Sequence, residues 1–106
     1  MINEEIKQSA IHIFELSIEV TEKTAYDCIC EFHGITKQLN VSAIRKKDKR
    51  YKPIINYCLF LNQDPYQPSK YDRDKRSLIS ILTEIKQELS ALLATANMER
   101  IKEIKH

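Results

Sequence analysis

Glycine is almost missing from this chain, because Gly34 is the only one among 106 residues. Loops that cradle phosphate groups, and folds built from many tight turns, both depend on glycine. The sequence therefore argues against a glycine-rich nucleotide site and against an all-β fold. The nucleophile-elbow, zinc-protease, P-loop and dinucleotide-binding motifs are missing as well. We expect a protein that is not an enzyme and that needs no cofactor.

Long hydrophobic runs are also missing, since no stretch approaches the roughly 18 apolar residues that cross a bilayer. The first twenty residues contain four glutamates, which the apolar part of a secretory signal peptide would not tolerate. Three cysteines are an odd number, and without a secretory signal they are expected to be free thiols. These observations predict a cytoplasmic protein.

The composition indicates one globular domain that spans residues 1–106. Apolar residues make up 42% and charged residues 30%, a balance typical of folded rather than disordered chains. The net charge of +2 gives no general nucleic-acid signature. A chain of this length can bury a core of its own without disulfides or metal.

Residues 2–20 are predicted to form an amphipathic helix. Their apolar residues recur three, four or seven positions apart, and further apolar positions widen the stripe into a broad buried face. Asn3 is a suitable N-cap, and Glu4 and Glu5 suit the positive end of the helix dipole. The stripe consists of Ile2, Ile6, Ala10, Ile13 and Val20, widened by Ile11, Phe14 and Ile18.

Residues 24–45 are predicted to form a β-hairpin. Apolar and polar residues alternate on both sides of His33-Gly34, which is the pattern of strands with one buried face. A two-residue loop at His33-Gly34 places the single glycine where a positive φ angle is required. That loop pairs Phe32 with Ile35, Cys28 with Leu39, and Tyr26 with Val41, all on the apolar face.

Residues 54–61 are predicted to form a third strand, which is apolar on both faces and follows Pro53. A central strand covered on both sides fits this pattern, and the β-branched and aromatic residues favour it. A short helix that begins at Pro53 is the alternative. Residues 62–69, rich in asparagine, aspartate and proline, predict a loop.

Residues 70–96 are predicted to form a long helix, with a capping box at Ser69 and Asp72. The helix would be roughly 40 Å long, whereas a domain of this size has a radius of gyration of about 13 Å. We therefore expect it to overhang the sheet, with residues 97–106 kinked or frayed. Together the elements predict an α+β fold in which two helices cover one face of a three-stranded antiparallel sheet.

The apolar residues of the last helix follow a regular spacing that also suits pairing with a second copy. We expect the first half of the helix to pack on the sheet and the remainder to form a homodimer. The leading hypothesis is thus a non-enzymatic protein that binds a protein partner or itself, with no membrane and no small-molecule substrate. The candidate residues for self-association are Leu82, Ile85, Leu89, Leu92 and Ala96.

Basic residues are concentrated in the segment 45–52, which has six positive charges against one negative. A second basic group, diluted by Asp72 and Asp74, opens the predicted last helix. Basic side chains beside an aromatic ring suit phosphate contacts and base stacking, although a solubilising hairpin tip has the same composition. The candidate nucleic-acid residues are Arg45, Lys46, Lys47, Lys49, Arg50, Tyr51, Lys52, Lys70, Lys75 and Arg76.

The predicted order helix-strand-strand-strand-helix resembles that of double-stranded-RNA-binding domains. Tyr26, Gly34 and Val41 look like the first-strand tyrosine, the turn glycine and the second-strand valine of that family. The resemblance implies contact with duplex RNA through the start of the second helix. The lysine-rich start of that helix in the family is missing here, so Lys70, Lys75 and Arg76 would have to replace it.

One grouping of residues would suit zinc, which needs four ligands at about 2.0–2.3 Å. It consists of Cys28, Cys30, His33 and Cys58. A C-x-C pair on a strand places both sulfurs on one face, and here that face is the one expected to point into the core. Unoxidised cysteine is among the most buried residue types, and His33 is explained by the turn. We therefore expect no metal.

Overall fold

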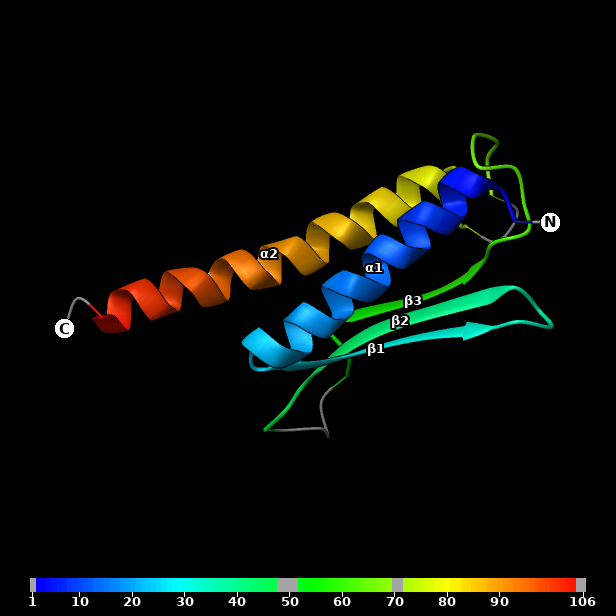
Figure 1. Cartoon of the computed structure of the whole chain (residues 1–106). Coiled ribbons are helices and arrows are strands. Elements are labelled where there is room, and N and C mark those ends of the chain that lie inside the picture. The colour runs from blue at the N-terminus through cyan, green and yellow to red at the C-terminus, as the bar shows by residue number, and fades with distance from the viewer. Residues whose placement is uncertain (1, 48–51, 70–71, 105–106) are drawn as a thin grey trace.

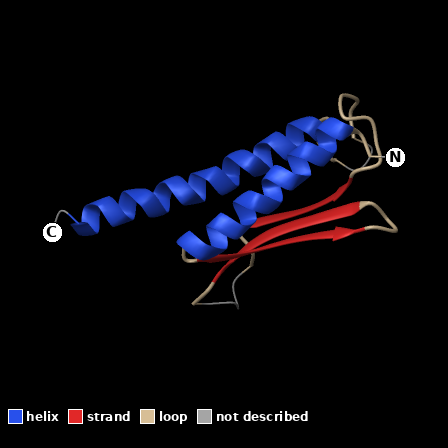
Figure 2. Ribbon diagram, in the orientation of Figure 1, coloured by secondary structure: helices blue, strands red, loops and turns tan. Residues whose placement is uncertain are grey.

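The structure is a computed structural model of the chain, and it describes residues 2–47, 52–69 and 72–104, with side chains described as far as residue 97. Both helices lie on the same side of an antiparallel sheet (Figures 1 and 2), which confirms the predicted α+β fold. In the described part of the chain, neither helix is apolar enough over a sufficient length to span a bilayer. The elements are α1 (Glu4–Lys23), β1 (Tyr26–His33), β2 (Gln38–Arg45), β3 (Ile55–Phe60) and α2 (Leu78–Ile104).

The first helix begins two residues later than predicted, directly after the predicted N-cap, and ends three residues later than predicted. The side-chain oxygen of Asn3 accepts the backbone N–H of Glu5 at 2.8 Å, so Asn3 is the N-cap. Lys46 closes the other end, since its ammonium group donates to the backbone carbonyls of Thr21 and Thr24. The buried face of α1 consists of Ile6, Ser9, Ile13, Leu16, Ser17 and Val20.

The predicted hairpin is present, but its predicted register is wrong by four residues. Cys28 pairs with Ala43 and not with Leu39, and a four-residue turn replaces the two-residue loop. The positive φ angle of 57° belongs to Lys37, whereas Gly34 has none. Because the shift is an even number of residues, the apolar sides of β1 and β2 still face the helices.

The third strand is confirmed, although it is not central. The strand order is β1-β2-β3, so β2 lies in the middle and β3 is an edge strand. Leu59 pairs with Leu39 on the side that faces the helices. The opposite side of the sheet carries polar residues such as Asn40 and Asn56 and has no helix over it. The prediction of a strand covered on both faces is therefore wrong.

The second helix starts at Leu78, eight residues later than predicted. The Ser77 hydroxyl accepts the N–H of Ser80 at 3.3 Å and occupies the capping position predicted for Ser69. Asp72 does not cap a helix, because its carboxylate accepts the N–H of Arg76 within the preceding loop. The helix then continues without interruption to Ile104, so the predicted kink or fraying is wrong for residues 97–104, while residues 105 and 106 lie outside the described residues.

The two helices start at the same end of the molecule and run in the same direction, with α2 continuing well past the end of α1 (Figure 1). Among the residues of α2 whose side chains are described, Leu89 is the last that is fully buried, and the molecule measures 51 × 27 × 25 Å, so the expected overhang is present. The largest fully buried side chains are Ile6, Ile13, Val20, Val41, Leu61, Leu78, Leu82, Ile85 and Leu89.

Candidate binding surfaces

An apolar groove lies between the outer flank of α1 and strand β1. It contains a cavity of about 380 Å³, whose walls include Phe14 from α1 and Phe32 from β1, and Leu39 also lines it. A second hollow of about 330 Å³ lies alongside Ile18 and shares Phe14 and Cys30 with the first. The two hollows together make one elongated depression along the helix. We call this depression the α1–β1 groove.

The α1–β1 groove is bordered by large apolar side chains that the chain leaves half exposed. The exposed fractions are 42% for Ile11, 51% for Phe14, 46% for Ile18 and 52% for Phe32. The sequence predicted the three α1 residues as part of a buried face, and this prediction is wrong. They lie on the flank of the helix, away from the core, where no other described element covers them. A contiguous apolar patch of this kind is typical of an interaction surface.

The side chain of Thr21 forms hydrogen bonds with the outer edge of β1, the edge that does not pair with β2, at one end of the groove. Its hydroxyl accepts the N–H of Cys28 at 2.9 Å and donates to the carbonyl of Cys28 at 3.3 Å. The backbone of Cys28 therefore points away from β2, and the alternation of an antiparallel ladder directs Cys30 and Phe32 outward in the same way. The side chain of Thr21 thus takes the position that a further strand would otherwise occupy at Cys28.

The predicted self-association residues divide into two groups. Leu82, Ile85 and Leu89 are fully buried in the core of their own chain and offer no surface to a second copy. Leu92 packs against the edge of this core and is partly buried, and Ala96, one turn further on, is partly buried as well. Leu93, which the prediction omitted, is partly buried beside them. We refer to residues 90–104 as the projecting half of α2.

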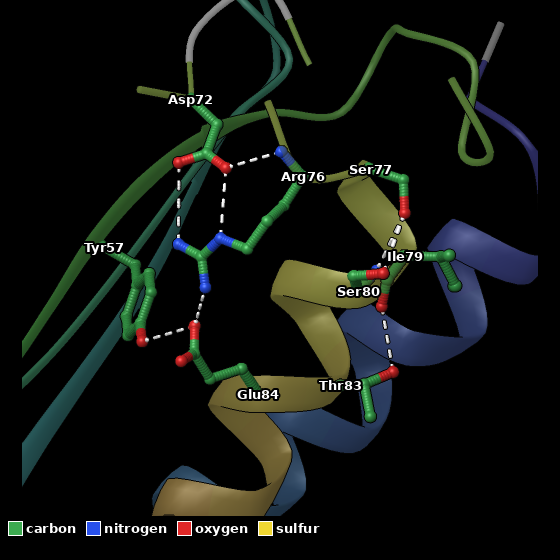
Figure 3. Close-up of polar contacts among 8 residues, drawn as sticks. All are labelled: Tyr57, Asp72, Arg76, Ser77, Ile79, Ser80, Thr83 and Glu84. Carbon is green, nitrogen blue, oxygen red and sulfur yellow. Dashed lines mark hydrogen bonds and ion pairs between the residues drawn. The ribbon is translucent and has the colours of Figure 1, made fainter. Parts of the chain in front are cut away.

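A polar network fastens the loop before α2 to the helix and to β3 (Figure 3). The Arg76 guanidinium bonds the Asp72 carboxylate, with 3.0 Å between Nε and Oδ2, and it also forms an ion pair with Glu84. The Tyr57 hydroxyl donates to the same Glu84 carboxylate at 3.2 Å. Arg76 is therefore committed to contacts within the chain.

This network shifts the titration of its members. The hydrogen bonds from the Arg76 side chain and backbone hold the pKa of the Asp72 carboxyl below its usual range. Burial, together with the carboxylates of Glu88 and Glu84, raises the pKa of Tyr57. The shift at Asp72 favours its ion pair with Arg76, and the shift at Tyr57 favours the neutral phenol near neutral pH.

The shift at Asp72 predicts an acid-dependent part of the stability. An aspartate of an unfolded chain has a pKa of about 3.9, so the contact with Arg76 stabilises the fold above that pH and is lost as the pH falls through the lower folded-state pKa. We expect the free energy of unfolding of the wild type to fall below about pH 4 more steeply than that of Asp72→Asn. Urea unfolding between acidic and neutral pH measures this difference.

The matched control for this titration is Asp74→Asn, which changes an exposed neighbour two residues away. Its pH profile is expected to follow that of the wild type. Identical profiles for Asp72→Asn and Asp74→Asn would contradict the role assigned to Asp72.

The two predicted basic groups lie at opposite ends of the sheet (Figure 1). The described part of segment 45–52 consists of residues 45–47 and 52, and Lys46 lies beside the end of α1, whereas Lys49, Arg50 and Tyr51 lie outside the described residues. Arg45, Lys47 and Lys52 are exposed there, while Lys46 is engaged by the end of α1. The second group lies near the start of both helices.

Of the candidate cations that the structure describes in this second group, one is exposed and one is held in ion pairs, and the neighbouring Arg73 is exposed as well. Lys75 is exposed, with a φ angle of 59°, whereas Arg76 is held by two carboxylates. Lys70 lies outside the described residues. The structure therefore does not bring the two basic groups together into one nucleic-acid surface.

The four residues considered for zinc are divided between the two sides of the sheet. Cys28 and Cys30 pair with Ala43 and Val41 on the helix side, where burial raises the pKa of both thiols. His33 and Cys58 alternate onto the open side. Within the part of the chain that the structure describes, no three His, Cys, Asp or Glu residues are grouped as metal ligands would be.

None of the family models, curated proteins and solved structures that were compared with this chain matches it. The helix-strand-strand-strand-helix order that suggested a double-stranded-RNA-binding domain is present, but the family relationship gains no support from these comparisons.

Proposed function

We propose that this protein is a non-enzymatic binding protein that self-associates through the projecting half of α2. The observation that carries the proposal is the length of α2 beyond its own core. About fifteen residues, or roughly 22 Å at 1.5 Å per residue, follow Leu89. Leu92 and Leu93, in its first turn, still pack against the edge of the core, and the helix continues to Ile104 past the end of α1 (Figure 1).

The face of α2 that fills the core continues into this projecting half. Leu92 and Ala96 extend the four-three spacing of Leu82, Ile85 and Leu89, and Leu93 lies next to them. An isolated helical stretch of this length is marginally stable in water, so most of its stability has to come from packing of the apolar face. A second copy of the chain would supply such packing without any other partner.

Sedimentation velocity over a range of protein concentrations tests self-association. We expect a species of twice the 12.5 kDa chain mass, and its loss in Leu93→Glu, which places a charge on the apolar face. The matched control is Thr95→Glu, because Thr95 is exposed on the other side of the same helical turn. A species of single-chain mass at every concentration would refute the proposal.

Nucleic-acid binding is the second candidate, and the exposure of Arg45, Lys47 and Lys52 at one corner of the sheet favours it. Fluorescence anisotropy of labelled duplex RNA, duplex DNA and single strands at two salt concentrations tests it. A specific role predicts binding that weakens steeply with salt and is abolished in the double variant Arg45→Glu, Lys47→Glu. Lys75→Glu, at the opposite end, is the control for charge alone, and flat traces would exclude this candidate.

A further inference from the structure

We infer that two copies of the chain also pair through the α1–β1 groove, with α1 of each copy covering the groove of the other. This contact goes beyond the proposed function, because it uses the flank of α1 that faces away from α2. The Lys86 ammonium donates to the Ser9 hydroxyl at 3.5 Å, so Ser9 lies on the flank next to α2. Ile18 lies about two and a half turns further along α1 and hence on the opposite flank, where it lines the groove.

The groove has opposite charges at its two ends. Lys7 lines the first hollow and Glu22 the second, while Phe14 lies between them and lines both hollows. Both charged side chains are exposed. They are separated by roughly 22 Å along α1 at 1.5 Å per residue, so they cannot form an ion pair with each other in one chain. The groove is therefore neutral as a whole but has a positive end and a negative end.

An antiparallel arrangement of two copies matches these ends. In a two-fold contact centred near Phe14, the positive end of each groove meets the negative end of the other, and Lys7 lies twice opposite Glu22 of the second copy. Ile11 and Ile18 lie three and four positions to either side of Phe14, so each isoleucine meets the other one across the axis. Parallel helices would instead place like charges opposite each other. This flank of α1 is thus complementary to itself in one orientation.

This pairing covers the large apolar side chains that one copy leaves half exposed. Phe14 is 51% exposed and would meet its counterpart near the axis. Phe32 on β1 is 52% exposed and lines the first hollow, so it would face the Ile18 end of the second copy. Burial of apolar surface is the main favourable contribution to association between proteins. The groove is therefore filled by side chains from both copies.

The outer edge of β1 is less suited to pairing than the flank of α1. A joined sheet needs free backbone groups along β1, but the Thr21 hydroxyl already bonds the N–H and the carbonyl of Cys28. If Cys30 paired with Phe32 of a second copy, Glu31 would lie opposite its own counterpart, and like charges in that position are unfavourable. Contact through side chains of α1 avoids both problems.

One charge opposes the contact and makes it the weaker of the two. Glu15 follows Phe14 and is exposed, so the two Glu15 carboxylates would lie near the axis. Their repulsion weakens the pairing. We therefore expect α2 to pair at low protein concentration and the groove to pair only as the concentration is raised.

The Leu93→Glu variant isolates the groove contact, because its α2 pairing is disabled. In sedimentation velocity it is expected to be a single chain at concentrations at which the wild type is a dimer, and to reach twice the chain mass as the concentration is raised. Adding Phe14→Glu is expected to abolish this second association. Adding Ile29→Glu, on the open side of the sheet, is the control and leaves it intact.

Charge reversal tests the antiparallel alignment without changing a buried residue. In the Leu93→Glu chain, Lys7→Glu and Glu22→Lys each replace two attractive pairs by two repulsive ones, so each is expected to raise the dissociation constant about tenfold. The double variant Lys7→Glu, Glu22→Lys restores opposite charges at both ends and is expected to return the dissociation constant to its original value. Glu15→Gln is expected to lower it.

The outcomes separate this contact from the proposed function. If Leu93→Glu is a single chain at every concentration while the wild type is a dimer, the groove contact is refuted and pairing through α2 stands. If the double reversal pairs as weakly as the two single reversals, the antiparallel alignment is refuted. A wild type that is a single chain at low concentration and pairs only at high concentration, with loss in Phe14→Glu, would refute the proposed function and support the groove contact.

Discussion

Replacement of Leu82 by alanine is expected to lower the free energy of unfolding by about 2–5 kcal/mol. Leu82 is fully buried among the core residues of both helices and the sheet. Truncation to alanine removes its apolar contacts and leaves a cavity that the close-packed surroundings fill only in part. Since domains of this size are stable by only about 5–15 kcal/mol, the loss is a large part of the total. Urea unfolding followed by circular dichroism measures it.

Leu92→Ala is the matched control, since it makes the same truncation on the same helix at the partly exposed edge of the core. Leu92 is partly exposed, so its truncation is expected to cost much less than that of Leu82. Both variants need to be compared at one protein concentration, because self-association couples stability to concentration. Equal losses for the two variants would contradict the assignment of Leu82 to the core of its own chain.

Replacement of Thr21 by valine is expected to cost about 1–3 kcal/mol, the usual penalty for leaving partly buried polar groups without a partner. Valine keeps the shape of threonine but can neither accept the N–H of Cys28 nor donate to its carbonyl. The variant is also expected to aggregate more readily, because the outer edge of β1 becomes open to pairing with another strand. Urea unfolding and light scattering measure the two effects.

Thr83→Val provides the control for the loss of a hydroxyl on a helix. The Thr83 hydroxyl donates only to the carbonyl of Ile79 in its own helix, as Figure 3 shows, and Thr83 is exposed. A surface change of this kind usually alters stability by less than about 0.5 kcal/mol. If Thr21→Val and Thr83→Val have the same effect on stability and scattering, Thr21 does not protect the edge of β1.

The element types could be predicted because their apolar residues repeat with the period of a helix or a strand. Leu39, Val41 and Ala43 alternate with polar residues, and all three are buried on the helix side of β2. The register could not be predicted in the same way, because alternation fixes the face of each residue but not its partner. Gly34 suggested a two-residue loop, whereas Lys37 adopts the left-handed conformation in the actual turn.

The start of α2 shows where local sequence signals fail. Ser69 and Asp72 have the spacing of a capping pair, but Asp72 instead binds Arg76 in the loop. The apolar stripe itself begins only at Leu78, and that signal marks the true start. A pattern that spans several turns was thus more informative than a motif of four residues.

The candidate site was harder to predict than the fold. Ile11, Phe14 and Ile18 widen the apolar stripe of α1, and hydrophobic character alone does not tell a core face from an exposed one. The width of the stripe was the available signal, because the described residues form one other helix and one sheet that can cover α1. The same limit applies to α2. Its apolar spacing predicted an interface that included Leu82, Ile85 and Leu89, but these residues are buried in the core of their own chain.

The pairing of α1 with α2 also bears on the order in which the protein folds. The two helices are separated by residues 24–77, so their contact closes a long loop, and such contacts slow folding because their entropic cost comes before their gain. A chain emerging from the ribosome would complete α1 and all three strands while the core-facing side of α1 still lacked its partner. Helix α1 can therefore complete its packing only after α2 has been synthesised. A synthesis product that stops before Leu78 would have no closed core.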